Sequence, residues 1–205
     1  MAEEKIYIKN GHLIIEALLG RASEEGVVIC HPHSLMGGSM YNNVVEAIQK
    51  AFTAENISTL RFNFRGVGGS TGVYEEGMGE QKDILAVCEY LKILGLTKLF
   101  LAGYSFGAWV GSKVVGESDN PFSFSFFVSP PIDYFKFNWD NLKNKINFLV
   151  CGDCDQFCGI DVLVRQAQKI NLPIEIIHGA DHFYSGKEKE LMRIIHKCII
   201  EKNTE

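Results

Sequence analysis

The pattern of apolar and polar positions divides the chain into two unequal parts. Residues 5–9 and 12–19 have the composition of β-strands, and the Asn10-Gly11 dipeptide between them favours a tight antiparallel hairpin. After the hairpin, short continuous apolar runs alternate with segments of helical periodicity. Continuous apolar runs are typical of strands that are buried on both faces, so this larger part predicts a mostly parallel sheet with helices on both sides.

The predicted α/β sheet has about eight strands, and five helices accompany it. Besides the hairpin, buried strands are predicted at residues 27–30, 59–64, 99–102, 124–128, 146–151 and 174–177. Helices are predicted at residues 43–52, 80–94, 106–115, 161–169 and 187–201. No repeat, low-complexity tract or linker interrupts this order. Residues 1–205 are therefore expected to form a single domain.

Composition and charge narrow the classes of partner. A net charge of −5 with 46% hydrophobic residues is ordinary for a globular protein, and it disfavours nucleic acid and anionic membrane surfaces as partners. The first residues lack the basic region and apolar core of a signal peptide, and no apolar run approaches the ~20 residues that span a bilayer. We therefore expect a cytoplasmic protein whose six cysteines are free thiols.

One pentapeptide carries the first candidate chemistry. Gly103-Tyr104-Ser105-Phe106-Gly107 lies between a predicted buried strand and a predicted helix. A G-x-S-x-G motif in that position is typical of a nucleophile elbow, in which the glycines remove side chains that would collide at the sharp turn. The amino end of the following helix favours developing negative charge at the hydroxyl. The motif predicts Ser105 as a nucleophile, and the alternative is a loop serine that only caps the helix.

A serine nucleophile needs a base and an orienting acid, and the sequence offers candidates for both. His182 follows the last predicted strand, at the edge of the sheet where Ser105 also lies, and it is the predicted base. His178, at the end of the same strand, is the weaker alternative. Asp153 and Asp155 both follow the strand at 146–151, and the residues alone leave the choice between them open.

Other features carry a resemblance to a known family. The candidate residues occur in the chain order serine, aspartate, histidine, which is the order found in α/β hydrolases. Three further stretches read HPHSLMGG at residues 31–38, RFNFRGVGGSTG at residues 61–72 and ADHF at residues 180–183. With these features the chain resembles the α/β-hydrolase superfamily from about Gly26 to His182. Within it, the chain is similar to the small capless bacterial enzymes described as carboxylesterase-like or dienelactone-hydrolase-like.

The resemblance implies roles for several residues. The acid of the family commonly stands in a G-x-x-D loop, and that register selects Asp155 over Asp153, which is then a turn residue. Two backbone N–H groups form the oxyanion hole of such enzymes. One is that of Phe106, directly after the nucleophile, and the resemblance assigns the other to His33, with Ser34 as the neighbouring possibility.

The resemblance also implies an activity. We expect a serine hydrolase of the α/β-hydrolase fold that cleaves small carboxylic esters or thioesters through an acyl-serine intermediate, with no cofactor. Dienelactone hydrolases have cysteine where this chain has Ser105, so that particular activity is not expected. The alternatives are other chemistry on the same triad, as in a peptidase, a C–C hydrolase or a perhydrolase, and a non-catalytic binding protein on the same fold.

The segment before the strand at 146–151 sets the expectations for substrate. Only residues 130–145 lie there, which is too short for a cap domain, so the cleft should be open. The aromatic residues of this segment could line an acyl pocket or form an exposed patch or a homodimer contact; they are Tyr134, Phe135, Phe137 and Trp139. Contacts to a small-molecule substrate are predicted for Ser34, Leu35, Tyr104 and Tyr134.

Two patterns resemble metal sites. Cys151, Cys154 and Cys158 lie close enough in sequence to converge on one ion, but they lack a fourth ligand nearby. His31 and His33 could form a pair of ligands, but histidines that brace the loop and line the cleft are the favoured interpretation. We therefore predict no metal.

Overall fold

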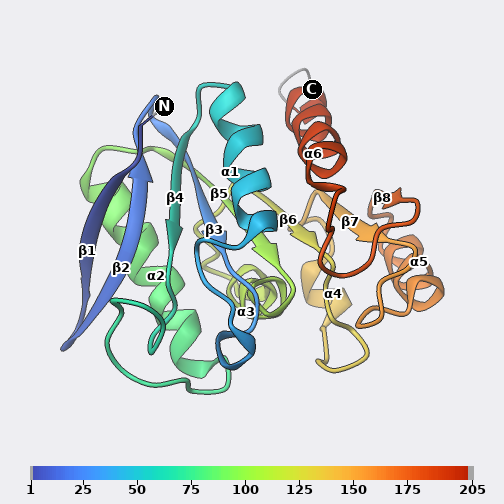
Figure 1. Cartoon of the computed structure of the whole chain (residues 1–205), viewed down its shortest axis with the longest axis horizontal. Helices are drawn as coiled ribbons and strands as arrows, with labels where there is room; N and C mark the ends of the chain where they lie inside the picture. Colours follow the sequence, from blue (N-terminus) through green and yellow to red (C-terminus); the bar gives the residue numbers. More distant parts are fainter. Residues whose placement is uncertain (1, 203–205) are drawn as a thin grey trace.

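The computed structural model describes residues 2–202, which form one mixed sheet between two layers of helices (Figure 1). The strands are β1 (Glu4–Asn10), β2 (Leu13–Gly20), β3 (Glu25–Cys30), β4 (Ser58–Phe62), β5 (Lys98–Tyr104), β6 (Phe124–Val128), β7 (Phe148–Gly152) and β8 (Ile174–Ile177). The α-helices are α1 (Asn43–Ala54), α2 (Met78–Ile93), α3 (Phe106–Gly116), α4 (Trp139–Leu142), α5 (Ile160–Lys169) and α6 (Glu188–Lys202). A short 3₁₀ helix, η1 (Ser34–Met36), follows β3.

The strand order in the sheet is β1-β2-β4-β3-β5-β6-β7-β8. The pairs β1–β2 and β2–β4 are antiparallel, and the strands from β4 through β8 pair in parallel. The predicted N-terminal hairpin and eight-stranded, mostly parallel sheet are therefore confirmed. Because β5 lies between β3 and β6, the loops that follow these strands meet at one edge of the sheet.

Two hydrophobic cores hold the layers together. On one face, α1 and α6 pack on the sheet and on each other; on the other face, α2, α3 and α5 cover it (Figure 1). The central strands are mostly apolar and buried along almost their whole length, as in Phe124–Val128, where every residue is buried. This explains why the runs read as continuous rather than alternating. No helix within residues 2–202 combines the length and the apolar character that crossing a membrane requires.

The predicted element boundaries fail at a few places. The sequence predicts β4 to residue 64, but the strand ends at Phe62, because the N–H of Phe64 donates to His31 Nε2 (3.0 Å) and not to a neighbouring strand. It also predicts β7 from residue 146, but Ile146 lies in the turn after α4, where its N–H donates to the carbonyl oxygen of Leu142. The elements η1 and α4 were not predicted, because three and four residues are too few to show a helical period.

Candidate active site

Ser105 lies at the sharp turn between β5 and α3, with φ 54° and ψ −119°. Residues other than glycine rarely adopt this conformation, and it costs about 1–3 kcal/mol that the surroundings must offset. The N–H of Ser105 donates to the carbonyl oxygen of Val128 on β6 (3.0 Å), and the N–H of Ala108 donates to the carbonyl oxygen of Ser105 (2.9 Å). The turn therefore holds the serine beyond the end of its strand.

The two glycines of the pentapeptide allow this turn to pack. A Cβ on Gly103 would lie 2.6 Å from the carbonyl oxygen of Gly107, and a Cβ on Gly107 would lie 2.4 Å from the carbonyl oxygen of Cys30. Both clashes are with backbone atoms, which cannot move aside cheaply. The glycine spacing is thus required by the close approach of α3 to β3 and β5.

Ser105, His182 and Asp155 form one hydrogen-bonded row. His182 Nε2 lies 2.8 Å from Ser105 Oγ, and His182 Nδ1 lies 2.9 Å from both carboxylate oxygens of Asp155. The Asp155 side chain has no exposed surface, and that of His182 is 6% exposed. Since a carboxylate only accepts, Nδ1 carries the proton, and the unprotonated Nε2 accepts from the serine hydroxyl.

The two alternatives from the sequence, Asp153 and His178, pair with each other. His178 Nδ1 lies 2.8 Å from Asp153 Oδ2, and the N–H of Gly179 donates to Asp153 Oδ1 (2.7 Å). These partners hold the pKa of Asp153 below its usual value. The His178 side chain is 88% exposed, so this pair lies on the surface and ties two loops together.

His182 is also held from behind. The hydroxyl of Tyr104 donates to the carbonyl oxygen of His182 (2.7 Å), and its ring centre lies 5.4 Å from that of the imidazole. Phe157 and Phe183 contact the imidazole from other sides, at ring distances of 4.6 and 5.7 Å. Tyr104 thus holds the backbone of His182 through its hydroxyl and contacts the imidazole through its ring, and sequence position alone did not specify either contact.

Two backbone N–H groups are available beside the serine. Phe106 begins α3, where an N–H has no partner within the helix, and His33 caps η1. Among the hydrogen bonds within residues 2–202, neither of these N–H groups has a protein acceptor. Both residues line the same pocket as Ser105. The structure therefore brings the two predicted oxyanion-hole residues to one place.

The side chain of His33 braces the loop that carries it. Its Nδ1 accepts from the N–H of Leu35 (3.2 Å), so the ring proton is on Nε2, which lies 3.2 Å from the hydroxyl of Tyr74. The ring also packs against that of Phe106, with centres 4.8 Å apart. Burial lowers the pKa of His33, which favours this neutral form.

His31 is a fully buried structural residue of the same loop. Its Nε2 accepts from the N–H of Phe64 (3.0 Å), and its Nδ1 lies 2.6 Å from the carbonyl oxygen of Pro32. Both ring nitrogens are thus occupied, as expected for a histidine that braces the loop. Burial lowers the pKa of His31 to about 4 from the ordinary value of 6.5.

His31 should make the stability of the protein fall in mild acid. Between about pH 6.5 and pH 4 the unfolded chain binds a proton at this residue and the folded chain does not, so lowering the pH favours unfolding. We expect urea unfolding to show that, from pH 7 to about pH 4.5, the native protein loses about 2–3 kcal/mol more than His31→Gln does. His12→Gln, at an exposed position, serves as the control. Equal losses in the native protein and His31→Gln would contradict this role.

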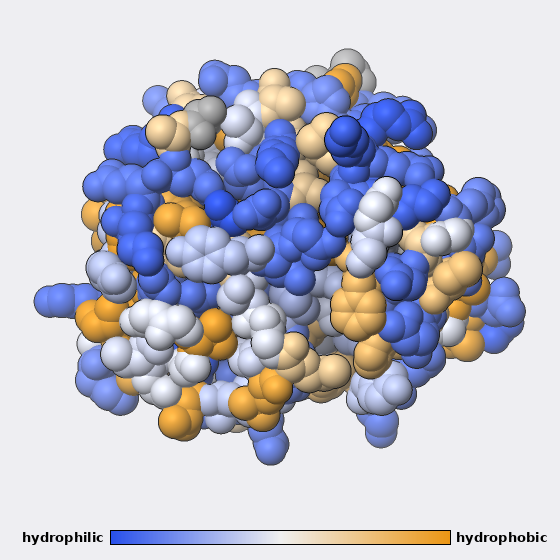
Figure 2. Space-filling model, viewed as in Figure 1, coloured by the Kyte–Doolittle hydropathy of each residue, from blue (hydrophilic) through white to orange (hydrophobic). Residues whose placement is uncertain are grey.

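A pocket of about 500 Å³ opens in front of Ser105. Its walls come from the loops after β3, β5, β6, β7 and β8, and they are Pro32, His33, Met36, Gly37, Gly38, Asn42, Tyr104, Ser105, Phe106, Pro131, Tyr134, Phe135, Phe157, His182 and Phe183. Apolar and pale residues gather on the lower part of the molecule in Figure 2, where η1 and the loop between β6 and α4 lie in Figure 1. No domain formed by residues 2–202 covers the mouth of the pocket.

Two of the predicted substrate contacts are absent from this wall. Ser34 and Leu35 form the turn of η1, and Leu35 is 71% exposed; neither lines the pocket, whereas Pro32 and Met36 from the same loop do. Tyr104 and Tyr134, the other two predicted substrate contacts, line the pocket. The sequence missed Phe157 and Phe183, although each directly follows a candidate active-site segment.

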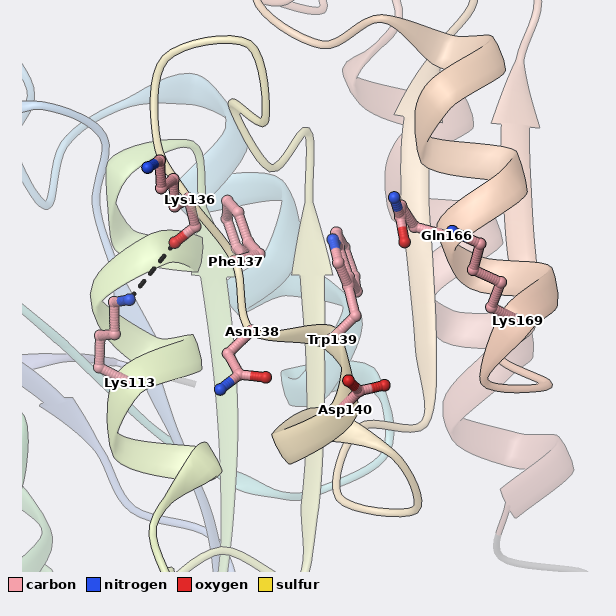
Figure 3. A pocket seen from close by; sticks show the side chains of 8 residues that line it. All are labelled: Lys113, Lys136, Phe137, Asn138, Trp139, Asp140, Gln166 and Lys169. Atoms are coloured by element: carbon pink, nitrogen blue, oxygen red, sulfur yellow. Dashed lines mark hydrogen bonds between the residues drawn. The ribbon is translucent and has the colours of Figure 1, made fainter.

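The aromatic residues of the 130–145 segment divide between two cavities. Tyr134 and Phe135 line the pocket with Ser105, whereas Phe137 and Trp139 line a separate, open groove of about 410 Å³ between α3 and α5. In that groove the rings of Phe137 and Trp139 stack with centres 5.3 Å apart, and Lys113 reaches the carbonyl oxygen of Lys136 (Figure 3). Two of the four aromatic residues thus line the pocket with Ser105, whereas Phe137 and Trp139 are partly buried against the core.

The three clustered cysteines do not converge. Cys151 and Cys158 are buried, whereas Cys154 is exposed and lies against Asp153. Among the described residues, no group of three or more histidine, cysteine and acidic side chains has the arrangement of a metal site.

Comparison with known proteins agrees with the fold. The chain is 32% identical to a solved α/β serine hydrolase homologue from Coxiella burnetii, with 96% of this chain and 97% of that chain aligned and a TM-score of 0.86. A solved α/β serine hydrolase without a lid from Xanthomonas campestris has a TM-score of 0.88 at 23% identity, over 98% of this chain and 95% of that one. An uncharacterized protein of Rickettsia prowazekii is 30% identical over 96% of this chain and 88% of its own length. No family model matches the chain.

The fold is that of an α/β hydrolase, with no cap domain among residues 2–202. More specifically, the chain belongs to the α/β serine hydrolase family, because it is similar to the Coxiella burnetii homologue along almost the whole length of both chains.

Proposed function

We propose that this protein cleaves small, uncharged carboxylic esters or thioesters, with Ser105 as nucleophile, His182 as base and Asp155 as the orienting acid. The observation that carries the proposal is the continuous row from Ser105 Oγ through both imidazole nitrogens to the buried carboxylate, with contacts of 2.8 and 2.9 Å. A nucleophile, a base and an orienting group within hydrogen-bond reach are the minimum that acyl transfer needs.

The proposed reaction has two halves. Ser105 Oγ attacks the carbonyl carbon while His182 Nε2 takes its proton, and the negative oxygen that forms accepts hydrogen bonds from the N–H groups of Phe106 and His33. The bond to the leaving alcohol or thiol then breaks, and His182 returns the proton to it. In the second half, water attacks the acyl-serine, His182 takes and returns the proton in the same way, and the acid leaves.

The lining of the pocket supports an uncharged substrate. Of the described residues that form its wall, none is a lysine, arginine, aspartate or glutamate, and aromatic rings make up much of it. A charged acyl group would lose water there without gaining a partner. The proposed substrate is therefore a free small molecule. We also propose a cytoplasmic location, with which the six free cysteines are consistent.

A fluorophosphonate probe combined with two esters tests the proposal. We expect the probe to add one organophosphoryl group at Ser105 of the folded protein, located by peptide mass spectrometry, and none at the buried Ser129 or after heat denaturation. We also expect p-nitrophenyl butyrate to give a burst and to be cleaved about tenfold or more faster than the anionic mono-p-nitrophenyl succinate. Folded protein that is neither labelled nor active on any ester or thioester of a substrate panel would overturn the proposal.

A further inference from the structure

A second row of hydrogen bonds lies behind Asp155. Cys151 Sγ is 3.8 Å from Asp155 Oδ2, Ser129 Oγ is 4.0 Å from Cys151 Sγ, and the hydroxyl of Tyr184 is 2.8 Å from Ser129 Oγ. Cys151, Ser129 and Tyr184 are all buried without exposed surface. Ser129 follows β6, Cys151 is the last residue but one of β7, and Tyr184 lies in the loop after β8, so the row runs across the edge of the sheet.

The direction of this row is fixed by its ends. The carboxylate of Asp155 can only accept, so the thiol of Cys151 donates to it. Ser129 donates to the sulfur, and its one proton is then used, so Ser129 accepts from the hydroxyl of Tyr184. All three protons therefore point toward the carboxylate, an arrangement in which each bond polarises the next.

The donors keep their protons at neutral pH. The neighbouring thiol of Cys158, together with burial, raises the pKa of the Cys151 thiol. Burial raises the pKa of Tyr184 well above its ordinary value. Neither group competes with Asp155 for the negative charge.

The backbone is strained at both residues that carry the hydroxyls. Ser129 has φ 45° and Tyr184 has φ 54°, in the left-handed region that residues other than glycine rarely adopt. The N–H of Ser129 donates to the carbonyl oxygen of Val150 on β7 (2.8 Å), which holds the first of these turns. The hydroxyls thus meet because two unusual turns bring them together.

We propose that Cys151, Ser129 and Tyr184 are positioning residues that fix the carboxylate plane of Asp155 for its contact with His182. The N–H of Phe157 holds one carboxylate oxygen from the front (2.9 Å), and the thiol of Cys151 holds the other from behind. With both oxygens held, the carboxylate cannot rotate away from the imidazole. The inference rests on the proposed function for its effect on activity, but the geometry concerns the protein without substrate.

Two measurements on a graded set of variants test this inference. We expect Cys151→Ala to lower kcat for p-nitrophenyl butyrate about three- to fivefold at unchanged KM, since a weak hydrogen bond is lost. Ser129→Ala and then Tyr184→Phe should cost progressively less, and Cys151→Ser, which keeps a donor, should recover most of the loss. In the resting protein, the ¹⁵N resonance of His182 Nδ1, assigned with His182→Gln, should move in the same order.

Cys88→Ala is the matched control, because it removes an equally buried thiol on α2, far from this row. It should leave both kcat and the His182 resonance as in the native protein. The inference is wrong if Cys151→Ala shifts neither quantity more than Cys88→Ala does, or if Cys151→Ser is as impaired as Cys151→Ala. If the native protein cleaves no ester, the proposed function fails, and the ¹⁵N shifts alone still decide whether the row orients Asp155.

Discussion

Replacing Ser105 with alanine is expected to lower kcat for p-nitrophenyl butyrate about a millionfold. The substitution removes the atom that would form the acyl bond, and it leaves His182 Nε2 facing a methyl group in place of the hydroxyl now 2.8 Å away. The pocket and the N–H groups of Phe106 and His33 would remain, so a small residual acceleration over the uncatalysed reaction should persist. Stopped assays at high enzyme concentration would measure it.

A comparison of single and double variants tests whether the three residues act together. If the three residues act as one unit, His182→Ala should cost about as much as Ser105→Ala, and the double variant should cost no more than either. Ser112→Ala is the matched control, since Ser112 is another buried serine of α3 whose hydroxyl donates to the carbonyl oxygen of Trp109, outside the pocket. It should keep native kcat. Losses that multiply in the double variant, or Ser105→Ala activity above about a hundredth of native, would contradict the proposed roles.

The fold could be predicted from sequence because its signals are local. The strands of the parallel part are mostly apolar runs, and the segments between them have helical periodicity, so both can be recognised from short stretches of sequence. The boundaries could not be predicted in the same way. β4 ends at Phe62 because of a hydrogen bond to His31, which lies 33 residues earlier in the chain.

The same distinction between local signals and long-range contacts applies to the candidate site. Ser105 and His182 could be proposed from short motifs next to predicted strand ends, and the structure places them 2.8 Å apart. The choice between Asp153 and Asp155 could not be made from the residues alone. Both follow β7, and each has a histidine partner. Only the loop geometry places the Asp155–His182 pair beside the pocket and the Asp153–His178 pair on the surface.

The residues that support the site were beyond the reach of sequence patterns. Ser129 is separated by 22 positions from Cys151 and by 55 positions from Tyr184, so no local pattern joins them, and the sequence pointed to Cys151 only as a candidate metal ligand. The same applies to Leu35. The sequence predicts it as a substrate contact, but the turn of η1, which was not predicted, leaves its side chain exposed and outside the pocket wall.

Replacing Asp155 with asparagine is expected to lower kcat about ten-thousandfold with little change in KM. The asparagine amide can donate its NH₂ group to His182 Nδ1, which must then be unprotonated. The imidazole proton moves to Nε2, and Nε2 can no longer accept the proton of Ser105. The comparison with Asp153→Asn is unusually direct. The two aspartates stand on one loop, two residues apart, and their histidine contacts are 2.9 and 2.8 Å.

The two aspartates differ in burial and in what their histidines reach. The side chain of Asp155 is fully buried and that of Asp153 is 33% exposed, and only His182 of the two histidines reaches a serine. Asp153→Asn should therefore change kcat by less than about twofold, since an exposed contact between polar side chains contributes little. Steady-state kinetics on p-nitrophenyl butyrate, with thermal unfolding to confirm that both variants fold, separates the cases. Similar losses in the two variants would mean that the loop as a whole, and not the carboxylate of Asp155, supports activity.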